Sequence, residues 1–157
     1  DPASMCETAA NFKGVEHRIE YVATIDGIAF YNDSKATSVD AAVKALEAIS
    51  EGNAKTVLIL GGRGKNAPYA PLAPLIEKSV RGIVVIGEDA DNIESQLRGT
   101  VEIVRGTTLE DAVERSAELA EKGDVVLLAP ACASFDMFAS FEERGRIFKE
   151  AVMRLRS

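Results

Sequence analysis

The run TVLILGGRGK, residues 56–65, decides the fold, because it joins a strand that is almost continuously apolar to a glycine-rich turn. A strand of this composition has to be covered on both faces, and parallel sheets with helices on both sides provide such cover. The run therefore predicts a parallel α/β sheet. The turn after it lies at the carboxyl end of a strand, where ligands bind in folds of this class.

Strands and helices alternate on either side of this run. Further apolar strands are predicted at 82–87, 101–104 and 124–129. The spacing of apolar residues predicts helices from residue 38 up to Gly52, and over 71–79, 90–97, 109–121 and 141–155. Thr108 and Asp111 resemble a capping box at the start of one helix. This alternation implies one α/β domain with right-handed crossovers and helices on both faces of the sheet.

The segment before the first of these helices has a different pattern. Ile19, Tyr21 and Ala23 alternate with other residues, and Asp26-Gly27 separates them from a second β-rich run at 28–31. Asp-Gly between two such runs is among the best short-range hairpin signals. We therefore expect an antiparallel hairpin at the N-terminal end of a mainly parallel sheet.

Composition excludes several classes of protein. The 157 residues are 46% hydrophobic and 27% charged, which is typical of a folded soluble protein. The formal net charge of −7 argues against a binder of duplex nucleic acid and against binding to an anionic membrane surface. Cys6 and Cys132 are too few for a disulfide scaffold, and no apolar run is long enough to span a membrane. We expect a cytoplasmic protein in a reducing compartment.

The chain opens with DPASMCETAANFKG, residues 1–14, and does not begin with Met. This stretch has the pattern of the tail of a helix that Gly14 ends. We therefore expect the chain to be one part of a longer protein.

Two polar segments follow predicted strands and precede helices or turns. NDSKAT, residues 32–37, lies beside a helix N-terminus, where free N–H groups favour anions; the alternative is a loop whose Asp and Ser cap the helix. GGRGK, residues 61–65, lets a ligand approach the backbone and carries Arg63 and Lys65, which can hold a carboxylate or phosphate. The alternative is a plain glycine turn, since the segment matches neither G-x-x-x-x-G-K-[ST] nor G-x-G-x-x-G.

The third polar segment is PACASFD, residues 130–136, whose small residues leave room for a ligand to which Ser134 can donate. Ser134 lacks the G-x-S-x-G context of a hydrolase. The pattern favours a Cys132 that packs as a small hydrophobe over a Cys132 nucleophile with His17 as its base. His17 is the only histidine, which excludes a multi-histidine metal centre, and no metal ligand is predicted. Together, the three segments favour a site for small anions.

In this order, HRIEYV, YNDSKAT, LGGRGK and LAPACASFDMFASFEERG resemble the C-terminal domain of the Mur ligases, most closely the branch that adds D-glutamate. The resemblance covers nearly the whole chain. It implies a Rossmann-like domain over 15–157, and it makes 1–14 the end of a helix from a central domain. Ligases of this family build the peptide of bacterial peptidoglycan in the cytoplasm, and so serve cell-wall biogenesis, cell shape and cell division.

The resemblance also implies a reaction. ATP and Mg²⁺, both bound mainly by the central domain, serve to convert the carboxylate of UDP-N-acetylmuramoyl-L-alanine to an acyl phosphate, which the amine of D-glutamate attacks. Lys35 matches the catalytic lysine near the phosphates or the incoming amino acid, and Arg18 and Asp33 match residues that face ATP. The residues that match the D-glutamate pocket are Thr37, Lys65, Ser134, Phe135 and Phe141.

Two departures from the family pattern matter. Many relatives carry Asp at the position of Arg63, and we expect the Arg63 side chain to face solvent. The chain also lacks the ATP loop of the central domain, so we expect it to be inactive without the N-terminal and central domains of the same enzyme. Two alternatives stay open: a Mur or folylpolyglutamate ligase domain with another amino-acid substrate, and a non-catalytic anion-binding module.

Overall fold

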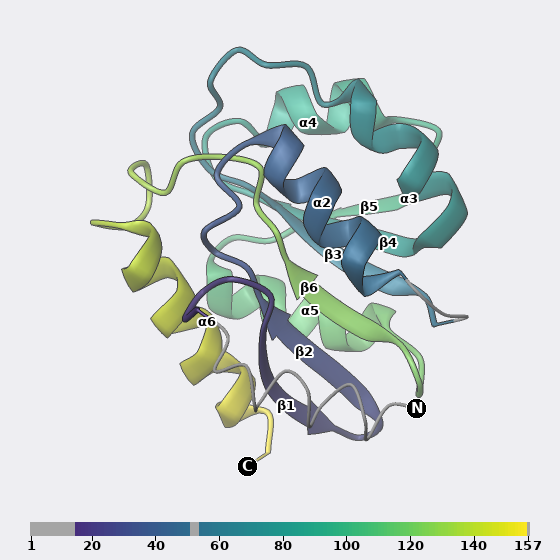
Figure 1. Ribbon diagram of the computed structural model, residues 1–157, viewed down its shortest axis with the longest axis vertical. Coiled ribbons are helices and arrows are strands. Elements are labelled where there is room, and N and C mark those ends of the chain that lie inside the picture. Colours follow the sequence, from purple (N-terminus) through teal and green to yellow (C-terminus); the bar gives the residue numbers. More distant parts are fainter. Residues whose placement is uncertain (1–14, 51–53, 157) are drawn as a thin grey trace.

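The computed structural model describes residues 15–50 and 54–156, which form one mixed sheet with helices on both faces (Figure 1). Its strands are β1 (Glu20–Ile25), β2 (Ile28–Asn32), β3 (Thr56–Gly61), β4 (Val80–Ile86), β5 (Glu102–Arg105) and β6 (Val125–Leu128). Across the sheet the order is β1-β2-β6-β3-β4-β5. β1 and β2 pair antiparallel and the other neighbours pair parallel, so the predicted α/β sheet with an N-terminal hairpin is confirmed.

The predicted Asp26-Gly27 turn joins β1 to β2. Asp26 has a φ of 53° and Gly27 a φ of 81°. Two successive residues with positive φ are typical of a type I′ turn, whose twist matches that of the flanking strands. The turn pairs Ile25 with Ile28, and both side chains are buried, so it also sets which face of the hairpin meets the core.

Short polar side chains start three of the helices. The helices of the described residues are α2 (Val39–Ile49), the 3₁₀ turn η1 (Ala70–Leu72), α3 (Ala73–Ser79), α4 (Ala90–Leu97), α5 (Leu109–Leu119) and α6 (Phe141–Arg154). Ser38, Thr108 and Ser140 cap α2, α5 and α6, each accepting a bond from the N–H three residues on.

Some boundaries differ from those expected. The helix predicted over 71–79 divides into η1 and α3, each with a proline in its first turn, where the missing N–H costs no hydrogen bond. The Asp111 carboxylate accepts from the N–H of Thr107 and not from that of Thr108, so the capping box forms in one direction only. The helix expected over 1–14 and the helix-ending Gly52 lie outside the described residues.

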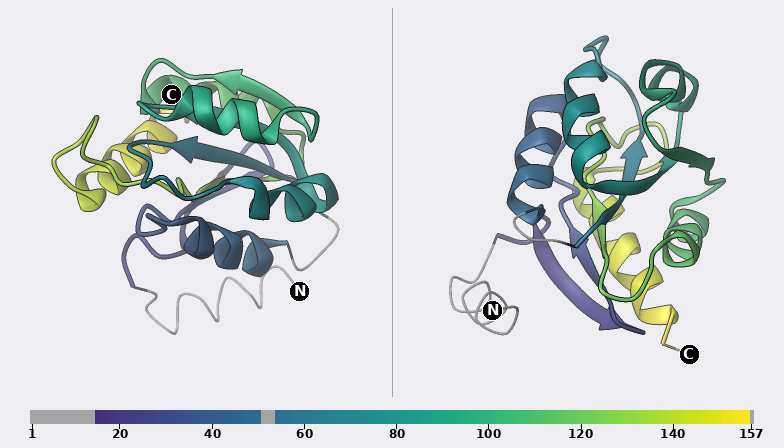
Figure 2. Two further views of the ribbon diagram at one scale, coloured as in Figure 1. Left: turned by 90° about the horizontal axis from the view of Figure 1, so that it is seen from above. Right: turned by 90° about the vertical axis from the view of Figure 1, so that its right-hand side faces the viewer.

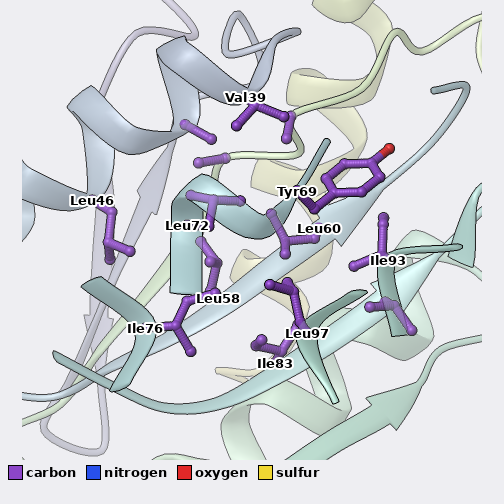
Figure 3. Close-up of a cluster of buried hydrophobic side chains, with 14 of the residues drawn as sticks. Val39, Leu46, Leu58, Leu60, Tyr69, Leu72, Ile76, Ile83, Ile93 and Leu97 are labelled. Carbon is purple, nitrogen blue, oxygen red and sulfur yellow. The ribbon is translucent and has the colours of Figure 1, made fainter. Parts of the chain in front are cut away.

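Helices cover both faces of the sheet (Figure 2), and a hydrophobic core lies on each face. Alternate residues of β3 point to opposite sides, and all of them are fully buried. On one face, Leu58 and Leu60 belong to a cluster with side chains of α2, α3 and α4, including Leu46, Ile76, Ile93 and Leu97 (Figure 3). On the other face, Val57 and Ile59 belong to a cluster with side chains of α5 and α6, including Leu109, Val113, Phe148 and Val152.

The strand order brings three loops to one edge of the sheet. β6 lies between β2 and β3 and runs parallel to both. The carboxyl ends of these three strands therefore meet at the same edge, where α/β sheets bind ligands. No helix within residues 15–50 and 54–156 is both long enough and apolar enough to cross a membrane.

Candidate functional site

Three loops leave β2, β3 and β6 at this edge: the first loop (residues 32–37), the second loop (61–65) and the third loop (130–136). Backbone hydrogen bonds join them. The N–H of Ala131 donates to the carbonyl of Ala36 over 2.9 Å, which links the third loop to the first. Arg63 and Ala133 exchange two bonds of 2.9 and 3.0 Å, which link the third loop to the second. The three segments picked out in the sequence are thus joined side by side by backbone hydrogen bonds.

A hollow of about 320 Å³ opens beside the first loop, between that loop and α2. It brings together Arg18, Asp33 and Lys35, which come from two separate stretches of chain. Its lining is completed by Ile19, Ala36, Ala41, Lys44 and Ala45. A hollow with three cationic side chains and one carboxylate suits an anionic ligand that also carries hydroxyl groups.

Lys44 is a lining residue that the sequence pattern did not single out. It lies on α2 between Ala41 and Ala45, which line the same hollow. Ala41 and Ala45 are one helical turn apart and therefore share a face. A lysine beside two such small residues was the available signal, and it is a weak one because lysine is common on exposed helix faces.

Asp33 is the buried acid of this hollow, with 5% of its surface exposed. Its N–H donates to the carbonyl of Leu128 over 2.8 Å, which anchors the start of the first loop to the end of β6. Burial raises the pKa of the Asp33 carboxyl from 3.8 to about 6, while a hydrogen bond from the backbone of Ile19 and the charges of Arg18 and Lys35 oppose the shift. A buried acid whose pKa is strongly shifted is a common feature of functional sites.

We expect Asp33→Asn to stabilise the chain at neutral pH. The pKa of Asp33 is higher in the folded state, about 6 against 3.8, so the folded state binds the proton more tightly. The free energy of unfolding of the wild type therefore falls as pH rises from about 4 to about 6, and stays low above that. Asparagine removes the cost of burying an ionised carboxylate and retains an oxygen that can accept from Ile19. The substitution should therefore raise the free energy of unfolding by about 1–2 kcal/mol at pH 7.

Urea unfolding at pH 4.5 and pH 7.5 measures this effect. The matched control is Asp40→Asn, which removes an exposed acid from the first turn of α2 and is expected to give no gain. A variant at Asp33 that is less stable than the wild type at pH 7.5 would show that the buried carboxylate supports the fold.

The other predicted site residues lie outside this hollow. Lys65 and Phe135 are exposed, and the Phe135 side chain is 64% exposed. Within residues 15–50 and 54–156, Lys65 makes no hydrogen bond or ion pair, so its ammonium group is available to a ligand. Thr37 is half-buried and Ser134 is buried. The described residues therefore do not enclose these four side chains in a single pocket.

Phe141, the last of the predicted site residues, packs against a buried histidine. It is the first residue of α6, and its ring meets the ring of His17 edge to face, with 6.2 Å between centroids. The Nδ1 atom of His17 accepts a hydrogen bond of 2.9 Å from the side-chain amide of Asn32. Gly145 makes room for His17, since a Cβ at that position would overlap the same Nδ1 atom. His17 is thus buried beside the first loop, where Asn32 and Phe141 hold its ring.

Cys132 is not paired with His17. Its thiol is fully buried and bonds the hydroxyl of Tyr69 over 3.1 Å, while that hydroxyl donates to the carboxylate of Asp89. Burial raises the pKa of the Cys132 thiol to about 11, so the thiol stays protonated at neutral pH. These contacts support the interpretation of Cys132 as a packed side chain and argue against a nucleophile.

Arg63 faces outward, as the sequence pattern predicts. Its side chain is 53% exposed, and its Nε atom lies 3.3 Å from a carboxylate oxygen of Glu88. An exposed ion pair of this kind contributes little to stability, about 1 kcal/mol at most. Among the residues that the structure describes, Lys65 is the cation of the second loop that makes no such pair.

The last helix supplies a further residue that the sequence pattern did not single out. Arg144 is 1% exposed, and its guanidinium donates to groups of the first and third loops. Arg144 lies three residues after Phe141 and four before Phe148, which places it on the inward face of α6. The sequence feature that could have identified Arg144 is an arginine on the apolar face of an amphipathic helix, because arginine is rarely buried without a specific partner.

Several known proteins resemble this chain in sequence or in fold. The family described as Mur ligase, glutamate ligase domain, matches residues 17–132. A protein of Koribacter versatilis named UDP-N-acetylmuramoylalanine–D-glutamate ligase is 51% identical over 98% of this chain, which covers 33% of that protein. A protein of the same name from Acinetobacter baylyi is 46% identical over 95% of the chain, which covers 34% of it. The chain thus spans about a third of the length of the curated relatives it matches.

Solved structures share the fold at low sequence identity. The MurF ligase of Thermotoga maritima, in complex with ADP, superposes with a TM-score of 0.60 at 16% identity, over 98% of this chain and 38% of that one. The bifunctional folylpolyglutamate synthase/dihydrofolate synthase of Yersinia pestis gives a TM-score of 0.61 at 16% identity, over 90% of this chain and 32% of that one. These likenesses concern the fold alone.

Proposed function

Because the chain belongs to the Mur ligase family through its glutamate ligase domain, we propose that it is the C-terminal domain of an enzyme that adds D-glutamate to UDP-N-acetylmuramoyl-L-alanine. The observation that carries the proposal is identity of 51% over 98% of the chain to a relative with that name. The cationic hollow and the three joined loops support it, because every substrate in this reaction is an anion.

D-glutamate would bind through the second and third loops. It carries two carboxylates, so its pocket needs positive charge and hydroxyl donors but little apolar surface. Lys65 offers an exposed ammonium group without a partner in the described part of the chain, and Thr37 and Ser134 offer hydroxyls at two strand ends. Phe135 and Phe141 would close the pocket. Since the described residues do not enclose these groups, the remainder of the enzyme would supply the other wall.

ATP would meet this chain at the hollow beside the first loop. Asp33 is an acceptor suited to a ribose hydroxyl, and Arg18 and Lys44 are cations suited to phosphates. Lys35, on the same loop, would lie near the phosphates or the incoming amino acid and serve catalysis by stabilising the negative charge that develops there. ATP supplies the phosphoryl group that activates the carboxylate, and this chain would bind and orient it.

The central domain would hold most of ATP and the Mg²⁺, because this chain has no phosphate-loop motif. In this proposal residues 15–157 are the amino-acid-binding domain, and residues 1–14, which lie outside the described part, continue a connecting helix from the central domain. The enzyme would work in the cytoplasm on peptidoglycan synthesis. The chain alone would be inactive.

Radiolabelled amino-acid incorporation by the intact enzyme tests the proposal. With ATP, Mg²⁺ and UDP-N-acetylmuramoyl-L-alanine, we expect D-glutamate to be incorporated and L-glutamate, L-lysine and glycine to be ignored. Incorporation of another amino acid in preference would assign the chain to a different ligase. Calorimetry of the 157-residue chain with ATP or D-glutamate tests the alternative of a non-catalytic binding module. Micromolar affinity would support the module. Weak or absent binding would fit a site shared between domains.

A further inference from the structure

All three loops of the site converge on one buried side chain, that of Arg144 in α6. Its Nε atom donates to the hydroxyl of Ser34 over 2.9 Å, and one terminal nitrogen donates to the Ser34 carbonyl over 2.7 Å. The other terminal nitrogen donates to the carbonyl of Cys132 over 3.0 Å. The second loop lies against the same group, since a Cβ on Gly62 would lie 3.4 Å from that nitrogen. One guanidinium therefore hydrogen-bonds the first and third loops and lies close to the second.

Arg144 is buried and makes no hydrogen bond or ion pair to a carboxylate among the described residues, although the charge of Asp136 acts on it. Each of its three side-chain hydrogen bonds goes to a neutral oxygen, and no ion pair of the described part includes it. Burial lowers its pKa to about 10, so it remains charged at neutral pH. A buried charge is expensive, and a well-packed apolar side chain often serves stability as well or better. Stability alone therefore does not account for an arginine here.

The atoms that Arg144 holds are adjacent to the proposed ligand contacts. Ser34 lies between Asp33 and Lys35, which line the hollow. Cys132 lies two residues before Ser134, which belongs to the proposed D-glutamate pocket. Arg144 itself is buried, with 1% of its surface exposed, so we do not expect it to contact a ligand directly.

We propose that Arg144 is a positioning residue, whose guanidinium fork holds the first and third loops against the second so that the ATP-facing and D-glutamate-facing groups keep one relative geometry. The inference rests on the proposed function. It adds the residue that links the groups facing ATP to the groups facing D-glutamate. A planar fork can donate in three fixed directions at once, whereas a lysine ammonium at the end of a flexible stem cannot reproduce that pattern. Displacement of reacting groups by about 1 Å can reduce the rate about 100-fold.

Arg144→Lys and Ser34→Ala in the intact enzyme test the inference. The first keeps the charge but loses the fork, and the second removes one acceptor of the guanidinium together with the bond from that hydroxyl to the carbonyl of Phe141. We expect Arg144→Lys to lower kcat/KM for both ATP and D-glutamate by about 10- to 100-fold, and Ser34→Ala to lower both by a smaller factor. The matched control is Arg81→Lys, at the opposite end of the sheet, where the arginine pairs with Glu121 and Asp124. It should lose stability but keep both kinetic constants.

Hydrogen–deuterium exchange of the same variants separates this inference from the proposed function. In Arg144→Lys we expect faster exchange in residues 32–37, 61–65 and 130–136 together, and in Arg81→Lys no change there. If the wild-type enzyme ignores D-glutamate, the proposed function fails, while the exchange pattern still judges the role of Arg144. A folded Arg144→Lys with wild-type exchange in the three loops, or with wild-type kinetic constants in an enzyme that does use D-glutamate, would overturn the inference.

Discussion

Replacement of Lys65 by alanine is expected to raise the KM for D-glutamate by about 10- to 150-fold in the intact enzyme, with a much smaller change in the KM for ATP. Lys65 is an exposed lysine on the second loop, without a hydrogen bond or ion pair to the described residues. Its ammonium group therefore supports no part of the described fold, and truncation should leave the fold intact. A charge-assisted hydrogen bond to a substrate carboxylate is worth about 1.5–3 kcal/mol, which sets the size of the effect.

Steady-state kinetics with D-glutamate and ATP varied separately measure this prediction. Lys122→Ala is a suitable control, because Lys122 is also exposed but lies before β6, at the opposite end of the sheet. It should leave both KM values unchanged. Unchanged KM and kcat in Lys65→Ala would remove Lys65 from the site and weaken the assignment of D-glutamate to the second loop.

Replacement of Gly61 by alanine is expected to destabilise the chain by about 3–5 kcal/mol, which is a large part of the stability of a typical domain. Gly61 ends β3 with a φ of 132°, a conformation that residues with a Cβ rarely adopt. A Cβ there would also overlap the carbonyl oxygen of Ile86 in the neighbouring strand β4. Relief of this overlap requires β3 and β4 to separate, because the oxygen belongs to the backbone.

Urea or thermal unfolding of the chain measures the loss. Gly99→Ala separates the two causes, because Gly99 has a φ of 87° but a Cβ added there would have no atom of the described residues within 4 Å. Backbone strain alone should make Gly99→Ala lose about 1 kcal/mol. Equal losses at the two glycines would show that the close approach of β3 and β4 has no energetic consequence.

Much of the fold could be predicted from local patterns. Asp26-Gly27 predicts the hairpin because both residues adopt positive φ readily, and the turn then sets the pairing of Ile25 with Ile28. Apolar runs predict the buried strands, since the four apolar residues 57–60 of β3 face one core or the other. Boundaries were less exact where proline changes the helix type, as at the start of η1 and α3.

The site could be predicted only in part. The family resemblance identifies Arg18, Asp33 and Lys35, and the structure brings these three into one hollow. It does not identify Arg144 or Lys44, whose places depend on which helix faces lie over the loops. The roles of Thr37, Lys65, Ser134, Phe135 and Phe141 stay predictions, because the described residues do not enclose a pocket around them.

The sequence by itself determined the features that depend on near neighbours along the chain: the turn at Asp26-Gly27, the helix caps and the apolar period of each strand. Such features arise from backbone dihedral preferences and from contacts within a few residues. Only the tertiary structure decided that β6 lies between β2 and β3, that Asp33 is buried, and that Arg144 reaches Ser34, 110 residues away in the chain. These depend on packing between distant segments, which no local pattern encodes.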